Sequence, residues 1–420
     1  MTRMVTTLTL SFAALIGIVA VYPLRNTVAD EAPPWKFAMQ EIDRTLKVGY
    51  AVLLADVNAD GRIDIIVVDT QRVIWFENPT WKMHYILKGG TKPDNVCIDA
   101  YDIDGDGRLD FALGADWRPF DTRTGGTLQW LWQTDSPYKP FELYPIDTEP
   151  TIHRIRFADV LGIGKAQLVS VPLMGRLASR DKNWMDAPVR ISAYRIPKDP
   201  KHDRWLPEVL DASLHVAHNF HIADLDGDKR LDVLVASYEG VSLLRTRSGG
   251  QWQRTLLGAG NQEKLNSNRG ASEVKVGRLK SGRIFIATIE PWHGHQVVIY
   301  TQPNRFGTAL WERHVIDEEL RWGHAVWCAD LDGDGNDEVV IGVRDRLNEQ
   351  IGPGVRIYRC LDGVGHRWGR AIIENGGVAC EDLAVADLDN DARPDIVAVG
   401  RFTGNVRIYW NRTPPQSGAR

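Results

Sequence analysis

The sequence lacks the short motifs that identify most hydrolases and nucleotide-dependent enzymes. It contains no Gly-x-Ser-x-Gly nucleophile elbow, no phosphate-binding loop after a strand, no zinc-protease helix motif and no dinucleotide-binding fingerprint. Each of these motifs holds reactive or backbone groups at a fixed spacing, so the corresponding chemistry has no support here. The sequence therefore predicts no nucleotide cofactor.

Cysteine is scarce as well. The 420 residues include only 4 cysteines, at the irregular positions Cys97, Cys328, Cys360 and Cys380. The first three lie in strand-like runs, where cysteine usually acts as a small hydrophobic residue. We expect neither a disulfide framework nor a metal site built on sulfur.

No excess of basic charge is present. The formal net charge is -5, and the lysines and arginines are interspersed with acids rather than clustered. Nucleic acid is therefore not an expected partner. The hydrophobic content of 43% and the charged content of 25% are typical of a soluble globular protein with a sizeable core.

One long apolar run occurs, at the N-terminus, from Leu8 to Tyr22, and small residues follow as far as Ala29. This layout predicts a signal peptide over residues 1–29 and export to the periplasm or the extracellular space. The alternative is an uncleaved membrane anchor, although the run is about one turn short of a comfortable span. No cysteine lies near the cut, which excludes a bacterial lipoprotein.

An acidic nine-residue pattern recurs five times along the rest of the chain. Oxygen-bearing side chains stand at its positions 1, 3, 5 and 9, which is the ligand type that calcium prefers. The predicted metal ligands are Asp56, Asn58, Asp60 and Asp64; Asp102, Asp104, Asp106 and Asp110; Asp224, Asp226, Asp228 and Asp232; Asp330, Asp332, Asp334 and Glu338; and Asp387, Asp389, Asp391 and Asp395.

Apolar strand-like runs flank these turns where an EF-hand would have helices. A single acidic turn can be a solvated loop, but five copies at matching positions indicate structural calcium that ties strand to strand. Two further copies have decayed: Asp159–Gln167 keeps its flanking strands but loses carboxylates, and Gly277–Gly282 is a shortened turn. Seven turns are therefore present, five of them suited to metal.

The segments between the turns predict the blades of an all-β propeller. A strand follows each turn, then a third run such as Val297–Tyr300, then a fourth run that begins with an aromatic residue, such as Trp311–Ile316. Four strands in every fifty to sixty residues or so is the repeat of a propeller blade.

The seventh blade has its third run at Val406–Trp410 and then lacks a fourth. Residues Trp35–Ile42 have the matching aromatic-to-isoleucine spacing, so we expect this N-terminal strand to close the ring and remove the open edges. The prediction is a seven-bladed β-propeller of four-stranded blades over residues 30–412, followed by a flexible tail at residues 413–420.

A candidate site emerges at the start of the first strand of each blade, because these strands line the central channel of a propeller. The positions six residues before each turn, or their equivalents, are Tyr50, Val96, His153, His218, Ser272, His324 and Glu381. Two residues further on, every position is apolar: Val52, Ile98, Ile155, Phe220, Val274, Val326 and Leu383. The apolar core is therefore expected to end there, with a polar ring of three histidines and a glutamate beyond it.

This ring suits two kinds of chemistry, and the sequence does not choose between them. Neutral imidazoles can ligate a divalent metal, or act as general base and acid near neutral pH. The catalytic candidates are His153, His218, His324, Glu381 and Tyr50. The loops between second and third strands should reach the same rim, and they supply the substrate-binding candidates Asp116, Arg118, Tyr238, Glu290, His293, His295, Arg344 and Arg401, with Asp69 nearby.

The last two blades resemble one branch of the FG-GAP-like repeat family, the propeller domain of the aldos-2-ulose dehydratase/isomerase family. The similarity is sharpest at Gly323–Gly335, Gly376–Asp389 and Gly400–Asn411. The resemblance implies water elimination from a keto-sugar such as 1,5-anhydrofructose or an aldos-2-ulose. The appended domains associated with isomerisation have no counterpart in this sequence, so that activity is not carried over.

Elimination of this kind requires a base for the proton next to the ketone, an electrophile or metal at the carbonyl oxygen, and an acid for the departing hydroxyl. Under this hypothesis His153, His218 and His324 divide the three roles, Glu381 orients or ligates, and Arg344 or Arg401 holds sugar hydroxyls. The competing hypothesis is a non-catalytic FG-GAP-like propeller that binds glycans or a protein partner at the same rim.

Overall fold

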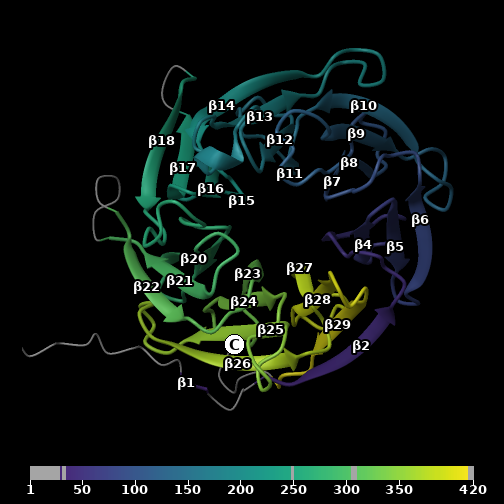
Figure 1. Ribbon diagram of the computed structural model, residues 1–420. Coiled ribbons are helices and arrows are strands. Elements are labelled where there is room, and N and C mark those ends of the chain that lie inside the picture. Colours follow the sequence, from purple (N-terminus) through teal and green to yellow (C-terminus); the bar gives the residue numbers. More distant parts are fainter. Residues whose placement is uncertain (1–28, 31–34, 247–249, 304–309, 415–420) are drawn as a thin grey trace, which may run out of the picture.

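The computed structural model describes residues 29–30, 35–246, 250–303 and 310–414. Seven antiparallel four-stranded sheets, one of them extended by a short parallel fifth strand, surround a common centre, which confirms the predicted all-β, seven-bladed propeller (Figure 1). The predicted signal peptide falls on residues outside the described ones, apart from Ala29. Within the described residues the only helical element is the 3-10 turn η1 (Arg180–Lys182), and no helix has the length and apolar character to span a membrane.

Blades 1 to 4 follow one another along the chain. Blade 1 contains β3 (Ala51–Ala55), β4 (Asp64–Asp69), β5 (Arg72–Glu77) and β6 (Lys82–Lys88). Blade 2 contains β7 (Cys97–Tyr101), β8 (Asp110–Ala115), β9 (Thr127–Trp132) and β10 (Glu142–Thr148). Blade 3 contains β11 (Ile152–Ala158), β12 (Gln167–Pro172), β13 (Val189–Arg195) and β14 (Leu206–Leu214). Blade 4 contains β15 (Asn219–Ala223), β16 (Asp232–Ser237), β17 (Gly240–Thr246) and β18 (Trp252–Gly258).

Blades 5 and 6 continue this order, and blade 7 combines the two ends of the chain. Blade 5 contains β19 (Glu273–Arg278), β20 (Ile284–Glu290), β21 (Gln296–Thr301) and β22 (Glu312–Asp317). Blade 6 contains β23 (Gly323–Ala329), β24 (Glu338–Val343), β25 (Gly354–Cys360) and β26 (Trp368–Asn375), with the short β1 (Ala29–Asp30) parallel to β26. Blade 7 contains β27 (Cys380–Ala386), β28 (Asp395–Gly400), β29 (Val406–Asn411) and β2 (Phe37–Asp43).

The pairing of β2 with β29 closes the ring as predicted. Phe37 lies opposite Asn411 and Asp43 opposite Val406 in an antiparallel register. At the same end of the sheet, the Thr413 hydroxyl accepts a hydrogen bond from the Lys36 amide at 3.0 Å. The first strand of each blade contacts the first strands of both neighbouring blades, so the seven inner strands converge on the channel.

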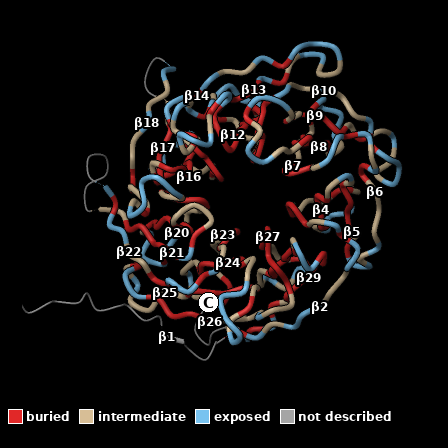
Figure 2. The backbone as a smooth tube through the Cα atoms, viewed as in Figure 1, coloured by how far each residue is buried: buried red, intermediate tan, exposed pale blue. Residues whose placement is uncertain are grey.

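Burial follows the order of strands within a blade. All seven second strands are buried along their whole length, as in the β-branched run of β4, because they are covered by neighbouring blades on both faces. Exposed residues collect on the outer strands and loops (Figure 2). The core therefore lies between blades. Ile65 and Val67 of blade 1, for example, pack in one cluster with Val397 and Ile408 of blade 7.

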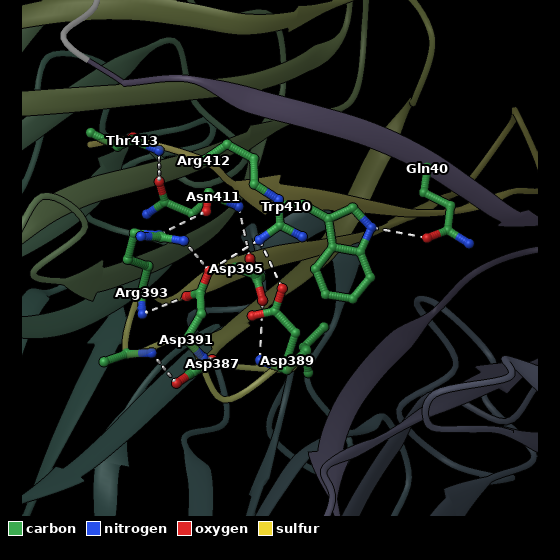
Figure 3. Close-up of polar contacts among 12 residues, drawn as sticks. Gln40, Asp387, Asp389, Asp391, Arg393, Asp395, Trp410, Asn411, Arg412 and Thr413 are labelled. Atoms are coloured by element: carbon green, nitrogen blue, oxygen red, sulfur yellow. Dashed lines mark hydrogen bonds and ion pairs between the residues drawn. The ribbon is translucent and has the colours of Figure 1, made fainter. Parts of the chain in front are cut away.

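The acidic turns connect first to second strands as expected, and Figure 3 shows the turn of blade 7. Asp387, at position 1, accepts hydrogen bonds from the amides of Asp391 and Ala392. Asp395, at position 9, is buried and accepts the amides of Leu388 at 3.0 Å and Asn411 at 2.7 Å. The position-9 carboxylate therefore braces the turn against the third strand, a structural role beyond any metal.

Two asparagines connect an acidic turn to the neighbouring blade. Asn78 follows the third strand of blade 1, and Asn411 ends the third strand of blade 7. The side chain of Asn78 donates to the Leu388 carbonyl at 2.8 Å, which joins blade 1 to blade 7. The side chain of Asn411 donates to the Leu331 carbonyl at 2.7 Å, which joins blade 7 to blade 6. Both contacts are buried, so loss of the amide leaves a carbonyl without its donor.

We predict that Asn411→Ala lowers the free energy of unfolding by about 2 kcal/mol, because the variant leaves buried backbone carbonyls without the hydrogen bonds that the Asn411 amide donates. Urea unfolding, followed by intrinsic fluorescence, measures the change. Gln350→Ala, at an exposed position, is the control and should match the parent. An Asn411→Ala variant as stable as this control would contradict the inter-blade role.

Candidate active site at the channel rim

The predicted ring residues lie together at one end of the inner strands. His153 belongs to β11, His324 to β23 and Glu381 to β27, while Tyr50 and His218 immediately precede β3 and β15. All five side chains are buried. This geometry follows from the equal spacing between each ring residue and its turn, because the turns hold the inner strands in equivalent positions.

Three histidines converge most closely, and one of them comes from a loop. The ring centroids are 4.5 Å apart for His218 and His293, 5.1 Å for His218 and His324, and 4.8 Å for His293 and His324. One ring nitrogen from each histidine lies within 4.8 Å of the other two. His293 follows β20 with a left-handed backbone, at φ 51°. It was expected among the loop residues, and it takes a place in the ring instead.

Two of these imidazoles have a partner on the far side of the ring. His324 Nδ1 donates to the Glu381 carbonyl oxygen at 2.6 Å, which leaves its Nε2 with the free lone pair. His218 Nδ1 lies 2.8 Å from a carboxylate oxygen of Glu273. The buried nitrogens His218 Nε2 and His293 Nδ1 make no hydrogen bond to any described residue. Oriented imidazoles with free nitrogens are the donor set of a divalent metal site.

His153 lies beside the trio rather than in it. Its ring centroid is 4.5 Å from that of His218, and its Nδ1 donates to the His218 carbonyl oxygen at 2.8 Å. Its Nε2 then accepts from the Arg154 guanidinium at 3.3 Å. The Trp117 ring covers it at a centroid distance of 5.1 Å. His153 is thus a neutral acceptor at the edge of the cluster.

The histidines are held neutral by their surroundings. Burial lowers the pKa of His153, His293 and His324 well below the usual range, and nearby arginines and histidines add to the effect. Burial also lowers the pKa of His218, where Glu273 acts in the opposite direction. Neutral imidazoles can accept a proton or bind a metal at neutral pH.

Glu381 is held between two arginines. Its carboxylate forms an ion pair with Arg401 and lies 3.5 Å from Arg344 Nη1. The Arg401 guanidinium also lies 5.3 Å from the centre of the Tyr50 ring. Burial and Asp94 raise the pKa of Tyr50, so its hydroxyl stays protonated and can donate. Two cations, one anion and one phenol therefore border the histidine trio.

The other loop candidates have partners of their own. Tyr238 is buried 6.4 Å from Trp292, between ring centroids, and burial raises its pKa to about 12. Asp116 pairs with Arg118 at 2.9 Å, and the His295 side chain is exposed. Glu290 is fully buried within blade 5, where Arg313 at 2.6 Å and Tyr300 at 2.6 Å bind its carboxylate. Asp69 is likewise buried and pairs with Arg72 at 2.6 Å.

Aromatic side chains surround the histidines, and sequence reasoning did not single them out. Trp292 lies 4.2 Å and Trp322 5.4 Å from His293, between ring centroids, and Trp117 flanks His153. Phe402, next to Arg401, is 72% exposed. A possible signal was their place in the chain: Trp117 and Trp292 each stand two residues after the second strand of a blade. Such rings suit stacking against a sugar.

A cavity of about 250 Å³ lies in the channel below the ring. Charged side chains line it at two levels. Arg154, Glu273 and Asp382 each come one residue after a ring position, and Asp99, Arg156 and Lys275 each come three residues after one. The expectation of an apolar core at this depth holds only for the intervening residues, which are buried between blades. Below the ring, side chains alternate along each strand, so every second residue faces the channel. Register shifts at His153, His324 and Glu381 interrupt this alternation at the ring itself.

Lys275 provides a test of this charged lining. Burial lowers its pKa to about 8, and Arg156 contributes in the same direction. In the unfolded chain the lysine keeps its proton up to about pH 10.4. The buried ammonium therefore lowers the stability of the folded state fully below about pH 8, and this destabilisation disappears as the pH rises towards about 10.4. We predict that Lys275→Met is more thermostable than the parent at pH 7 and that the difference narrows towards pH 10.

Differential scanning fluorimetry across this pH range measures the difference in Tm. Lys165→Met, at an exposed position, controls for loss of one positive charge. A difference for Lys275→Met that stays constant with pH, or that matches Lys165→Met, would show that the amine titrates normally.

Comparisons with known proteins agree with the repeat pattern. Residues 125–303 match a family model described as the β-propeller domain of aldos-2-ulose dehydratase, and residues 56–113 and 330–398 match the FG-GAP-like repeat. Aldos-2-ulose dehydratase of Phanerodontia chrysosporium is 30% identical over 311 residues, which are 69% of this chain and 33% of that protein. The match thus spans about a third of the relative's length.

Solved structures show the same fold at low sequence identity. BBS1N, crystallised in complex with ARL6DN, superposes with a TM-score of 0.53 at 11% identity, over 91% of this chain and 99% of that chain. At this identity the likeness concerns the fold alone.

Proposed function

Because the chain is an FG-GAP-like repeat propeller that resembles the β-propeller domain of aldos-2-ulose dehydratase, we propose that it acts on carbohydrate and eliminates water from a keto-sugar. The observation that carries the proposal is the convergence of His218, His293 and His324, with His153 beside them, in surroundings that keep all four imidazoles neutral. Such a cluster places acceptors for protons or a metal where the channel opens.

The proposal includes a divalent metal of the first transition row at His218, His293 and His324. The donor set fits, because the free nitrogens face one another and Glu273 and the Glu381 carbonyl orient two of the rings. When bound, such an ion withdraws electron density from a ketone oxygen and so acidifies the neighbouring C–H bond.

The remaining roles follow from protonation states. His153, a neutral acceptor, takes the proton from the carbon next to the ketone. The C–O bond of the next carbon then breaks, and the departing hydroxyl leaves as water after it accepts a proton from Tyr50, whose pKa is raised. Arg344 and Arg401 bind sugar hydroxyls while Glu381 holds both guanidiniums in place. The product is a conjugated enone.

We predict that His218→Ala and His324→Ala each reduce dehydration of 1,5-anhydrofructose by about 100-fold or more, because each variant removes one of the three imidazoles that would hold the metal. Ultraviolet absorbance of the enone measures the rate, and a panel of keto-sugars and uronides covers the substrate class. His202→Ala, at an exposed site on blade 3, is the control. Folded, calcium-loaded variants as active as the parent would refute the catalytic proposal.

A metal-depleted sample that has been reloaded with calcium alone distinguishes the effect of a channel transition metal from that of calcium in the acidic turns. Activity that returns only with zinc or manganese supports a channel metal, whereas full activity with calcium alone refutes it. Sugar binding by calorimetry without turnover would favour the second candidate, a glycan-binding propeller. The exposed Phe402 and the surrounding tryptophans are the observations that support this candidate.

We further propose that calcium occupies the five acidic turns and stabilises the blades. In blade 2, Asp102, Asp104 and Asp110 offer oxygens that all lie within 4.8 Å of one another, and the turns of blades 4 and 6 contain similar groups. These oxygens already converge without an ion, so binding requires little rearrangement.

We predict that chelation lowers Tm and that calcium restores it, since an ion that binds only the folded state stabilises it by about 2.7 kcal/mol per site at a concentration of 100 times Kd. Differential scanning fluorimetry measures the shift. Asp224→Asn combined with Asp228→Asn should reduce it by removing one site. A chelator that leaves Tm unchanged would contradict structural calcium.

A further inference from the structure

A second cluster of metal-binding side chains lies on the outer edge of the propeller, far along the blade from the channel. Glu312 and His314 stand two residues apart on β22, the outermost strand of blade 5, so they share one face of that strand. His366 comes from the loop between β25 and β26 of blade 6. The cluster therefore bridges two neighbouring blades.

The three side chains are close enough to share one ion. Nε2 of His314 and Nε2 of His366 each lie 3.9 Å from Oε2 of Glu312. The two imidazoles stack at a centroid distance of 4.5 Å and an angle of 25°. One donor atom from each residue lies within 4.8 Å of the other two. Ligands of a tetrahedral zinc ion, with bonds near 2.0–2.1 Å, stand roughly 3.3 Å apart.

Only a small contraction separates the observed spacing from that of a bound ion. The Glu312 side chain is 66% exposed, so it can rotate towards the histidines with little steric cost. The Thr301 hydroxyl is hydrogen-bonded to His314 Nε2 at 3.0 Å, and this contact must give way when the nitrogen binds an ion. The Glu312 and His366 side chains are both exposed, so solvent can reach the cluster from their side.

The loop that presents His366 is held rigid. Asp362 accepts hydrogen bonds from the amides of Val364, Gly365, His366 and Arg367. A Cβ atom at Gly365 would lie 3.0 Å from the Thr301 side chain, so the loop packs directly against blade 5. Rigid elements on both blades thus place the ligands before any ion binds, which favours affinity.

The chemistry of the three side chains also suits a metal. Two imidazoles offer nitrogen lone pairs, and Glu312 supplies negative charge. Two imidazoles and one carboxylate favour zinc or a neighbouring transition metal over calcium, which prefers oxygen.

We propose that Glu312, His314 and His366 form a transition-metal site of the zinc type that joins blades 5 and 6 at the outer surface. The site is independent of the channel histidines and of the acidic turns. Zinc bound there stabilises the propeller by linking the outer strand of one blade to a loop of the next, because the ion binds this arrangement only in the folded chain.

The test uses the full chain with one ligand removed from the channel trio, so that only the outer cluster keeps all three of its histidine and carboxylate ligands. In a His218→Ala background, depleted of metal and reloaded with calcium, isothermal titration should show one zinc-binding event and fluorimetry should show a zinc-dependent rise in Tm. Cobalt should produce the visible absorption bands of a tetrahedral complex. Hydrogen exchange should slow at residues 362–367 when zinc is added.

Adding His314→Ala or His366→Ala to this background should weaken zinc binding by at least about 10-fold and abolish the change in exchange, since even loss of a residue behind a ligand costs that much. Adding Glu312→Gln should weaken it as well. Adding His202→Ala, which removes an exposed histidine paired with Asp199, should change nothing. No zinc binding in the His218→Ala background, or binding unaffected by His314→Ala and His366→Ala, would overturn the proposal.

Discussion

The pairing of β2 with β29 is the contact on which the geometry of the whole ring depends. It completes blade 7, whose inner strand β27 contacts β23 of blade 6 and β3 of blade 1. Charged contacts reinforce it: Arg407 on β29 binds Glu41 on β2 at 2.9 Å and Glu374 of blade 6 at 2.7 Å. The histidines approach within bonding range of one ion because the blades that hold them cannot spread apart.

Much of this arrangement could be predicted because it repeats. The acidic turns revealed the period, the missing strand of blade 7 revealed the closure, and counting back from each turn placed His153, His218, His324 and Glu381 at one level. A repeat constrains every blade at once, so local errors in assigning strands do not accumulate. The predicted calcium ligands and the export signal remain predictions from the sequence.

The loops could not be predicted in the same way. Glu290 and His293 belong to one short segment and seemed equivalent in sequence, yet Glu290 turns into blade 5 towards Arg313 while His293 enters the ring. The backbone at His293 is left-handed, and nothing in the residue type requires that conformation. The charged lining of the channel could not be read from the apolar positions alone, because the residues on either side of them in each strand point to the opposite face.

The channel combines two electrical environments within a few strand residues. At the rim, burial and neighbouring cations hold the imidazoles uncharged. Just below, arginine, lysine and carboxylate side chains line a cavity. Fixed charges beneath an uncharged cluster act on any charge that develops there, and they do so without reorganising during a reaction. The lower lining thus belongs to the electrostatics of the site even where it touches no ligand.

The closure also has a consequence for how the chain folds. Trp410 hydrogen-bonds to Gln40 across a sequence separation of 370 residues, so the first strand of the propeller to be synthesised must wait for the last. Contacts between such distant residues form slowly, because the intervening chain loses much conformational freedom before the contact stabilises anything. Until then β2 is an unpaired strand beside an incomplete blade. The pairing of β2 with β29, which closes the finished ring, is therefore the contact that leaves strand edges unpaired for longest while the protein is being made.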